Sequence, residues 1–460
     1  MMKPQYKSEV ILKSKKVTQS MCLLSIPVIV SNLFKMVNEL VDMYFVSNLA
    51  VDKQTINLYI TSLTVAYPVI TIFETLIIAL GVVALTMISQ SVGENDNYKV
   101  TQYRKLFLKI GYYLGIILNL LLFGVSLFLV YASNNKMLYN VGIYVMIRSF
   151  EMVGLVYLYQ FQASHHAYGD TISPMIVCFI STLINIILTC ILTPYFNLVG
   201  AGVATVFSVY VSFFICLLFN HRNKTNMEEE PTTRESNIPK LRDIISLLIS
   251  SSGAGIMTAG GFIVVNRMIM SLGDNVMTSI ATSSRIYNVL SIPFLAIEVV
   301  LTAFISQNIG AKNYERVKKS ILSAFDIVIV VSLFVIGIGF LFNDNMHKVF
   351  IKNNHEVMLL CNYYFKHLLW TTFIMGLYHI IMGLLHGIKK LKFCFLLSVI
   401  RLWVLRIPIM MALIYKQNLG IEGVVISIYA SNIGCVIVGL CCLLFYFSKN
   451  VVLKKYKEKV

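Results

Sequence analysis

The chain has 460 residues, of which 57% are hydrophobic and 13% charged, and its mean hydropathy is +0.75. A soluble domain is about 45–50% apolar and about 25% charged, so this composition excludes an ordinary soluble protein and is typical of a polytopic membrane protein. The formal net charge of +16 also suits a nucleic-acid-binding protein, but the positions of the basic residues argue against nucleic acid as a partner.

About twelve apolar runs reach the length of about 20 residues that crosses a bilayer, and they form two series of six. We expect spans near residues 19–45, 58–88, 106–131, 138–162, 171–193, 198–219, 244–272, 276–305, 320–342, 357–386, 392–415 and 420–447. The predicted fold class is an all-α polytopic membrane protein with about 12 transmembrane helices in two homologous six-helix lobes. The expected parts are a basic tail at 1–18, lobes at 19–219 and 244–447, a linker at 220–243 and a basic tail at 448–460.

The first span carries charged residues on one helical face, because Lys35, Glu39 and Asp42 fall at i, i+4 and i+7. A charge at the bilayer centre costs at least about 2.5–3.5 kcal/mol, so this face is expected to look into protein or water. Lys35 and Glu39 form either a functional pair or an ion pair that merely tolerates burial. Asp42 has no basic partner one turn away, and we interpret it as a functional residue.

Polar residues continue through the first half of the chain. Glu74 lies in the second span, and Arg148 and Glu151 lie three residues apart in the fourth. We interpret the latter two as a structural pair. The fifth span holds Asn185 and Thr189.

Small residues mark two further helices. The sixth span opens with Gly200–Thr205, and the seventh carries several glycines, namely Gly253, Gly255, Gly260 and Gly261. Small residues let helices approach closely, so we expect tight helix contacts in the sixth span, and close packing or bending at a helix interface in the seventh.

The second half carries a different set of charges. Arg285 and Glu298 lie in the eighth span, His379 in the tenth, and Arg401 and Arg406 in the eleventh. These arginines do not describe a uniformly acidic cavity. They can also contact lipid headgroups or pair with carboxylates such as Glu298.

The basic residues outside the spans are distributed asymmetrically. With the N-terminus placed inside, about 26 Lys and Arg residues fall in the inside loops and tails and about 5 in the outside loops, a strong positive-inside bias. We therefore expect a multi-pass protein of the cell membrane with both termini and residues 220–243 in the cytoplasm. We also expect it to be a monomer.

An internal duplication is visible in two polar loops. Ile88–Val100 reads ISQSVGENDNYKV and Ile305–Val317 reads ISQNIGAKNYERV. A similar offset separates Gly169 from Gly387, and a fixed offset at several places marks a repeat. Because each repeat has six helices, both repeats start on the same side of the membrane. Parallel-repeat transporters have this arrangement and enclose a cavity between their halves.

No pattern of catalytic residues stands out. The chain has no Walker A loop and no Ser-His-Asp or HExxH context. Its cysteines lie mostly in apolar runs without the spacing of a metal site, so we expect no metal. Since no catalytic pattern is present either, we expect no cofactor and no enzyme activity. The enzymatic alternative is a membrane-embedded transferase that uses the histidines near helix ends, which are His165, His166, His379 and His386.

Several motifs resemble those of the multidrug and toxic compound extrusion (MATE) transporters. ISQNIGAKNYERV is similar to the Gly-Ala signature after their eighth helix, and Pro27 to Asp42 resembles their first-helix signature. Gly169 to Pro174, Asn185 and Gly200–Thr205 resemble their fifth and sixth helices in order and spacing. The likeness covers nearly the whole chain.

The resemblance implies two six-helix lobes and a cation-driven antiport of amphipathic solutes. It implies that Asp42 binds the coupling ion in the N-terminal lobe, with Asn185 and Thr205 at matching polar positions. Many members carry an acid where this chain has Thr189, so a sodium ligand is missing. A proton needs one titratable group, whereas sodium needs several oxygens, so we expect proton rather than sodium coupling.

We expect a small amphipathic substrate and contact with membrane lipid. The candidate residues for the substrate cavity are Glu39, Glu74, Glu151, Thr189, Arg285, Glu298 and His379. The alternative function is a lipid-linked oligosaccharide or polysaccharide flippase of the same superfamily, for which a cationic cavity wall would be suitable.

Overall fold

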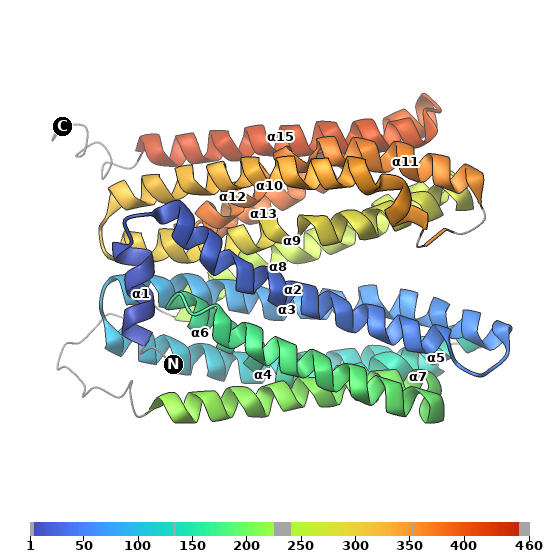
Figure 1. Cartoon of the computed structure of the whole chain (residues 1–460), viewed down its shortest axis with the longest axis horizontal. Helices are drawn as coiled ribbons and strands as arrows, with labels where there is room; N and C mark the ends of the chain where they lie inside the picture. Colours follow the sequence, from blue (N-terminus) through green and yellow to red (C-terminus); the bar gives the residue numbers. More distant parts are fainter. Residues whose placement is uncertain (1–3, 132–134, 225–240, 349, 352–353, 450–460) are drawn as a thin grey trace. The chain divides into compact units, whose positions relative to one another are not determined.

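The computed structural model describes residues 4–131, 135–224, 241–348, 350–351 and 354–449, and over this part of the chain it consists of helices and short connections without strands (Figure 1). The first seven helices are α1 (Pro4–Lys13), α2 (Val17–Ser47), α3 (Lys53–Gly93), α4 (Asn97–Tyr131), α5 (Lys136–Ser149), α6 (Glu151–Ala167) and α7 (Ile172–Lys224). The remaining elements are α8 (Leu241–Met270), α9 (Asp274–Gly310), α10 (Tyr314–Lys348), α11 (His355–Trp370), α12 (Thr372–Gly387), α13 (Leu391–Val399), the π-helix η1 (Ile400–Arg406), α14 (Ile407–Met411), the π-helix η2 (Ala412–Lys416) and α15 (Gly420–Lys449).

These elements give the predicted number of membrane spans. Nine segments of the described chain are individually long and apolar enough to cross a bilayer. The pairs α5–α6 and α11–α12 are bent by 48° and 47°. Each pair taken together is long and apolar enough to cross a bilayer as one broken span. Helix α7 contains two helices joined at Asn197, whose φ of 51° and ψ of −130° are not helical. Counted in this way, the described residues form twelve spans, which confirms the all-α polytopic fold and the expected number of helices.

Helix breaks and starts follow local sequence. The bend inside α7 lies beside Pro194 and Gly200, and a side chain at Gly200 would meet the backbone at Leu192. This tight turn therefore needs a glycine. Three helices begin with side-chain caps, since Asp52, Asn135 and Asn354 accept hydrogen bonds from backbone N–H groups of α3, α5 and α11.

The chain divides into two compact units. The first comprises Met1–Leu248 together with Ala303–Val317, and the second comprises Ile249–Thr302 together with Lys318–Val460. The last part of α9 therefore belongs to the first unit. The expected linker at 220–243 and the tail at 448–460 lie largely outside the described residues, as do the first three residues of the tail at 1–18.

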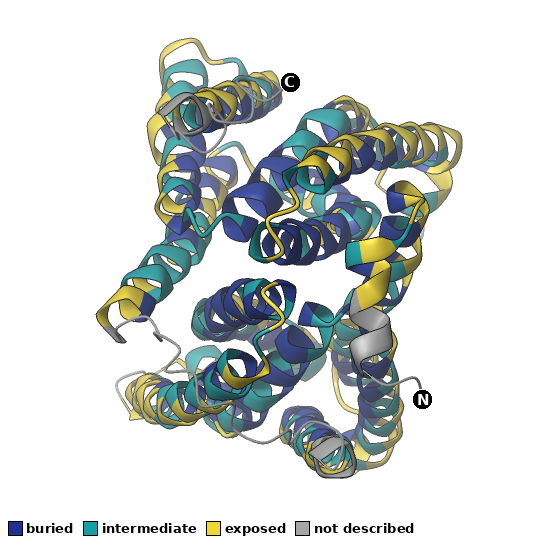
Figure 2. Ribbon diagram, turned by 90° about the vertical axis from the view of Figure 1, so that its left-hand side faces the viewer, coloured by how far each residue is buried: buried dark blue, intermediate teal, exposed yellow. Residues whose placement is uncertain are grey.

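Burial follows the pattern expected in lipid. Many helices carry buried residues along one side and exposed residues along the other (Figure 2). The exposed sides are apolar: on α4, Leu120 and Phe128 are 65% and 69% exposed, and on α10, Leu341 is 79% exposed. Exposed apolar faces of this extent are suited to contact with lipid tails.

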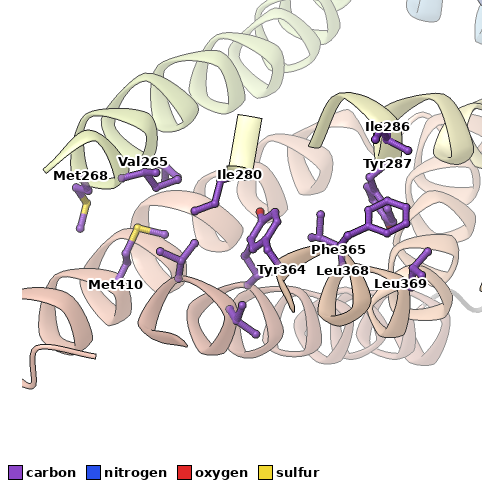
Figure 3. Packing of buried hydrophobic residues seen from close by; sticks show 14 of the residues in the cluster. Val265, Met268, Ile280, Ile286, Tyr287, Tyr364, Phe365, Leu368, Leu369 and Met410 are labelled. Atoms are coloured by element: carbon purple, nitrogen blue, oxygen red, sulfur yellow. The ribbon is translucent and has the colours of Figure 1, made fainter. Parts of the chain in front are cut away.

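The core of the second unit lies between α8, α9, α11, α14 and α15. Figure 3 shows part of this cluster, in which Tyr364, Phe365 and Leu369 of α11 lie with Ile280 of α9 and Met410 of α14. The glycines of α8 pack closely, as predicted. A Cβ atom at Gly261 would lie 2.9 Å from the Leu402 side chain, and one at Gly253 would lie 2.9 Å from the Phe395 ring.

The two repeated loops have the same backbone structure. Asn95 and Lys312 both have a φ of 56°, and each lies two residues after the end of its helix, α3 or α9. The N–H of the next residue, Asp96 or Asn313, donates to the carbonyl five residues earlier. This pattern is a Schellman motif, which satisfies the last carbonyls of a helix.

The repeated loops also contact each other within the first unit. A Cβ atom at Gly93 would overlap the backbone of Gln307, and one at Gly310 would overlap the backbone of Gln90. The contact is reciprocal, so the loops of the two repeats lie side by side in the first unit. In addition, Arg316 donates hydrogen bonds to the carbonyls of Ile11 and Ser14, near the end of α1. The helical structure of Pro4–Lys13 was not predicted.

Candidate ion-coupling site

Asp42 of α2 lies inside the first unit with only 1% of its surface exposed. Its Oδ2 atom accepts hydrogen bonds from the hydroxyl groups of Thr205 at 3.0 Å and Tyr144 at 3.1 Å. Thr189 Oγ1 lies 3.5 Å from Oδ1. The Nδ2 atom of Asn185 donates to Thr205 Oγ1 at 3.1 Å. The structure therefore brings together Asp42, Asn185, Thr189 and Thr205.

The hydrogen bonds to Asp42 come from neutral groups. Neutral hydroxyl donors stabilise a buried carboxylate less than a charged partner does. The nearest cation in the network is Arg148, whose Nη1 donates to the Tyr144 hydroxyl at 3.0 Å. Arg148 Nε also pairs with Glu151 at 2.8 Å, and Nη2 lies 3.8 Å from Glu74. Arg148 therefore pairs directly with Glu151 and Glu74, and reaches Asp42 only through the Tyr144 hydroxyl.

A cavity lies beside this network in the first unit. Its volume is about 110 Å³, enough for several water molecules. The charged residues that line it are Lys35, Glu39, Asp42, Glu74, Arg148 and Glu151. Four carboxyl groups therefore share one cavity with two basic side chains. Two negative charges would remain if all these groups were ionised, so the cavity is suited to a proton or another cation.

The lining of the cavity also includes apolar and aromatic side chains, namely Leu155, Leu158, Tyr159 and Val209. The ammonium group of Lys35 lies 4.3 Å from the centroid of the Tyr159 ring and donates to Gln162 at 3.3 Å. These contacts hold the Lys35 charge at an aromatic wall.

Three sequence-predicted residues lie elsewhere, in the second unit. Arg285 is exposed on α9. Glu298, also on α9, contacts two histidines of α12: His379 Nδ1 lies 2.6 Å from Oε2, and His386 Nδ1 lies 3.3 Å from Oε1. These residues are not part of the cavity beside Asp42, and the proposal that they line a substrate site remains a prediction.

Tyr144 was missed by the sequence interpretation. Tyr144, Arg148 and Glu151 follow each other at i, i+4 and i+7, the spacing of one helical face. This spacing could have identified Tyr144. The predicted pair between Arg148 and Glu151 forms, but it also belongs to the network around Asp42.

Twelve helical spans in the described residues, several of them broken, and a buried carboxylate beside a polar cavity are typical of a membrane transporter. A family model, MatE, matches residues 27–191 and 251–411, which is most of the chain. The chain belongs to the MatE family of multi-pass membrane transporters. The model covers one segment in each half, in agreement with the internal duplication.

Relatives of this chain match along almost their whole length. The probable multidrug resistance protein YoeA of Bacillus subtilis is 20% identical over 426 residues, which cover 90% of each chain. The FAD transporter of Shewanella oneidensis is 22% identical over 424 residues, again 90% of each chain.

Solved structures share the fold. A MOP superfamily transporter from Pyrococcus furiosus, described as having a binding pocket of reverse polarity, is similar with a TM-score of 0.86 and 18% identity over 97% of this chain and 98% of that one. A multidrug resistance MATE family transporter in an outward-facing conformation has a TM-score of 0.85 and 19% identity over 96% of this chain and 98% of that one.

Proposed function

We propose that the protein is a secondary active efflux transporter that exchanges protons for amphipathic organic solutes, with Asp42 as the coupling residue. The observation that carries this proposal is the burial of Asp42 among hydroxyl donors, beside a cavity with an excess of acidic groups. A buried carboxylate of this kind is costly when charged, and proton binding removes that cost. Occupation by a proton therefore changes which packing around α2 is favoured.

Proton coupling is the proposed form of the exchange because it needs a single titratable group, and among the described residues Asp42 is the carboxylate that contacts Thr205, Thr189 and Tyr144. The Oδ1 atom of Asn185 is buried and has no hydrogen-bond partner in the described chain. A sodium ion could use this oxygen as one ligand. Sodium needs several oxygen ligands, and a second acid is lacking at Thr189, so a proton is favoured.

A transport assay with purified protein in liposomes tests the proposal. Uptake of an organic dye would be measured with a pH gradient at equal sodium, and then with a sodium gradient at equal pH. We expect exchange only with the pH gradient. Exchange that follows the sodium gradient alone would reject proton coupling, and no exchange with any amphipathic solute would reject the transporter.

The proposed location is the cell membrane, with both termini in the cytoplasm and the protein acting as a monomer. The charge asymmetry of the loops supports this orientation. One relative is named a probable multidrug resistance protein and another a transporter, which favours transport over the transferase alternative.

A lipid-linked oligosaccharide flippase is the second candidate. It is favoured by two buried arginines of the second unit, Arg401 and Arg406, which suit an anionic lipid group. Transport of such a lipid without any proton dependence would favour this candidate over the antiporter.

A further inference from the structure

Two buried arginines in the second unit have no acidic partner. Arg401 and Arg406 are each 7% exposed. Within the part of the chain that the structure describes, neither has a carboxylate within 4 Å, whereas Glu298 is engaged by His379 and His386. An uncompensated buried charge is strongly unfavourable. A nearby anion would therefore stabilise the pair.

Neutral contacts hold both guanidinium groups in place. Arg406 donates from Nε to Ser431 Oγ at 2.9 Å and from Nη2 to Asn432 Oδ1 at 2.8 Å, both on α15. The Cζ atom of Arg401 lies 4.6 Å from the centroid of the Tyr378 ring on α12. Its Nε atom is buried and has no acceptor in the described chain. Arg401 Nε is therefore available to donate to an acceptor that a ligand supplies.

The π-helix η1 sets the relative positions of the two side chains. In an α-helix, residues five apart point about 140° away from each other. In η1 the N–H of Ile407 donates instead to the Leu402 carbonyl, five residues earlier, which turns Arg406 back toward Arg401. Pro408, which lacks an N–H, follows directly and favours this irregular turn. With this turn, the two side chains lie on nearby faces of η1.

We propose that Arg401 and Arg406 bind the phosphate group of an amphipathic phosphate ester. Two guanidinium groups offer several N–H donors to one anion, and phosphate has enough oxygens to accept from both. Aromatic rings flank the pair, because Tyr378 lies beside Arg401 and the Phe262 ring centroid lies 6.0 Å from Arg406 Cζ. These rings can hold the apolar part of the ligand. The phosphate belongs either to a soluble solute or to a phospholipid.

If the protein is a transporter as proposed above, this site makes amphipathic phosphate esters its substrate class. The role of the site in transport therefore rests on the proposed function. Binding itself can be tested without any gradient. Purified protein in phosphatidylcholine nanodiscs would be titrated with hexyl phosphate by calorimetry, with hexyltrimethylammonium as the cationic counterpart. The variants are R401Q, R406Q and R401K, with R267Q as the matched control because Arg267 is exposed on α8.

We expect wild type and R267Q to bind hexyl phosphate equally, and R401Q and R406Q to bind it about tenfold more weakly or worse. R401K keeps the charge but not the fork of donors, so its affinity should fall between these values. If the Gln variants do not fold, a folded R401K that binds like wild type overturns the site. Equal binding by wild type and folded R401Q, or equal binding of the cationic counterpart, also overturns it.

A second arm identifies the source of the phosphate. Hexyl phosphate should bind more tightly in lipid-free dodecyl maltoside micelles than in phosphatidylcholine nanodiscs if a phospholipid headgroup occupies the site, and equally in both if the ligand is a soluble solute. Either result supports a phosphate site if hexyl phosphate binding is weaker in R401Q than in wild type. Binding without gradient-driven transport would reject the proposed function alone.

Discussion

The hydroxyl group of Thr205 lies 3.0 Å from Oδ2 of Asp42, although the residues are 163 positions apart in the chain. This contact joins α2 to the second part of α7 inside the first unit. It supplies a directed donor to a carboxylate that is removed from bulk water. The coupling chemistry proposed for Asp42 therefore depends on Thr205.

Replacing Thr205 with Val should remove this donor while keeping the shape of the side chain. We expect proton-driven exchange to fall severalfold and the free energy of unfolding to fall by about 1–3 kcal/mol, the effect of an unmade hydrogen bond to a charged group. Thr205→Ser keeps the hydroxyl and should restore most of the exchange. Thr64→Val is a matched control, since Thr64 is exposed on α3 and donates only to the Ile60 carbonyl. Exchange by Thr205→Val at the wild-type rate would contradict this role.

The contact between the repeated loops should be sensitive to a single methyl group. Gly310→Ala places a Cβ atom against the backbone at Gln90, where there is no space. We expect a loss of about 1–3 kcal/mol from overpacking, measured by thermal unfolding in detergent. Gly124→Ala is the control, because no atom lies within 4 Å of its added Cβ. Equal stability of the two variants would show that the loops do not pack as described.

Thr189→Asp should add the acid that the coupling site lacks. The new carboxyl group would lie beside Asp42, since Thr189 Oγ1 is 3.5 Å from Oδ1 of Asp42. Two carboxylates together with the oxygens of Asn185 and Thr205 should bind sodium better than the wild-type site with Asp42 as its one carboxylate. We expect exchange to become dependent on sodium at fixed pH, measured as dye transport in liposomes. If wild type already follows a sodium gradient, the choice of proton is wrong.

The orientation of the chain can be tested with single cysteines at two exposed positions. Lys53 begins α3, and Asn97 begins α4 at the other end of the same span. A membrane-impermeant maleimide added to intact cells should label Lys53→Cys, and should label Asn97→Cys only after permeabilisation. The reverse pattern would place the termini outside. Protein without either substitution measures the background from the native cysteines.

The span pattern could be predicted from the sequence because apolar runs of spanning length are local features. The repeated loops were also visible, since they keep the same residues at the same offset. The broken spans were predicted as single helices, because no proline marks the bend at Phe150 between α5 and α6.

The contacts of the site depend on packing between distant segments, which the sequence does not show directly. Asp42 was identified from its polarity within an apolar helix, but its contact with Tyr144 was not. Glu298 and His379 were named separately, and their pairing across 81 positions was not predicted. The π-helix that brings Arg401 toward Arg406 was missed too, because the two residues do not share a face in an α-helix.

Exchange by Asp42→Asn under a proton gradient tests the central claim most directly. The variant mimics the protonated carboxyl group and cannot release a proton. Asp326→Asn, an exposed acid on α10, controls for the loss of a negative charge, and Asp42→Glu should keep partial exchange with a shifted pH profile. With equal membrane insertion and folding, we predict that Asp42→Asn abolishes gradient-driven efflux and Asp326→Asn does not. Efflux by Asp42→Asn at the wild-type rate would contradict the account and make Glu39 the next candidate.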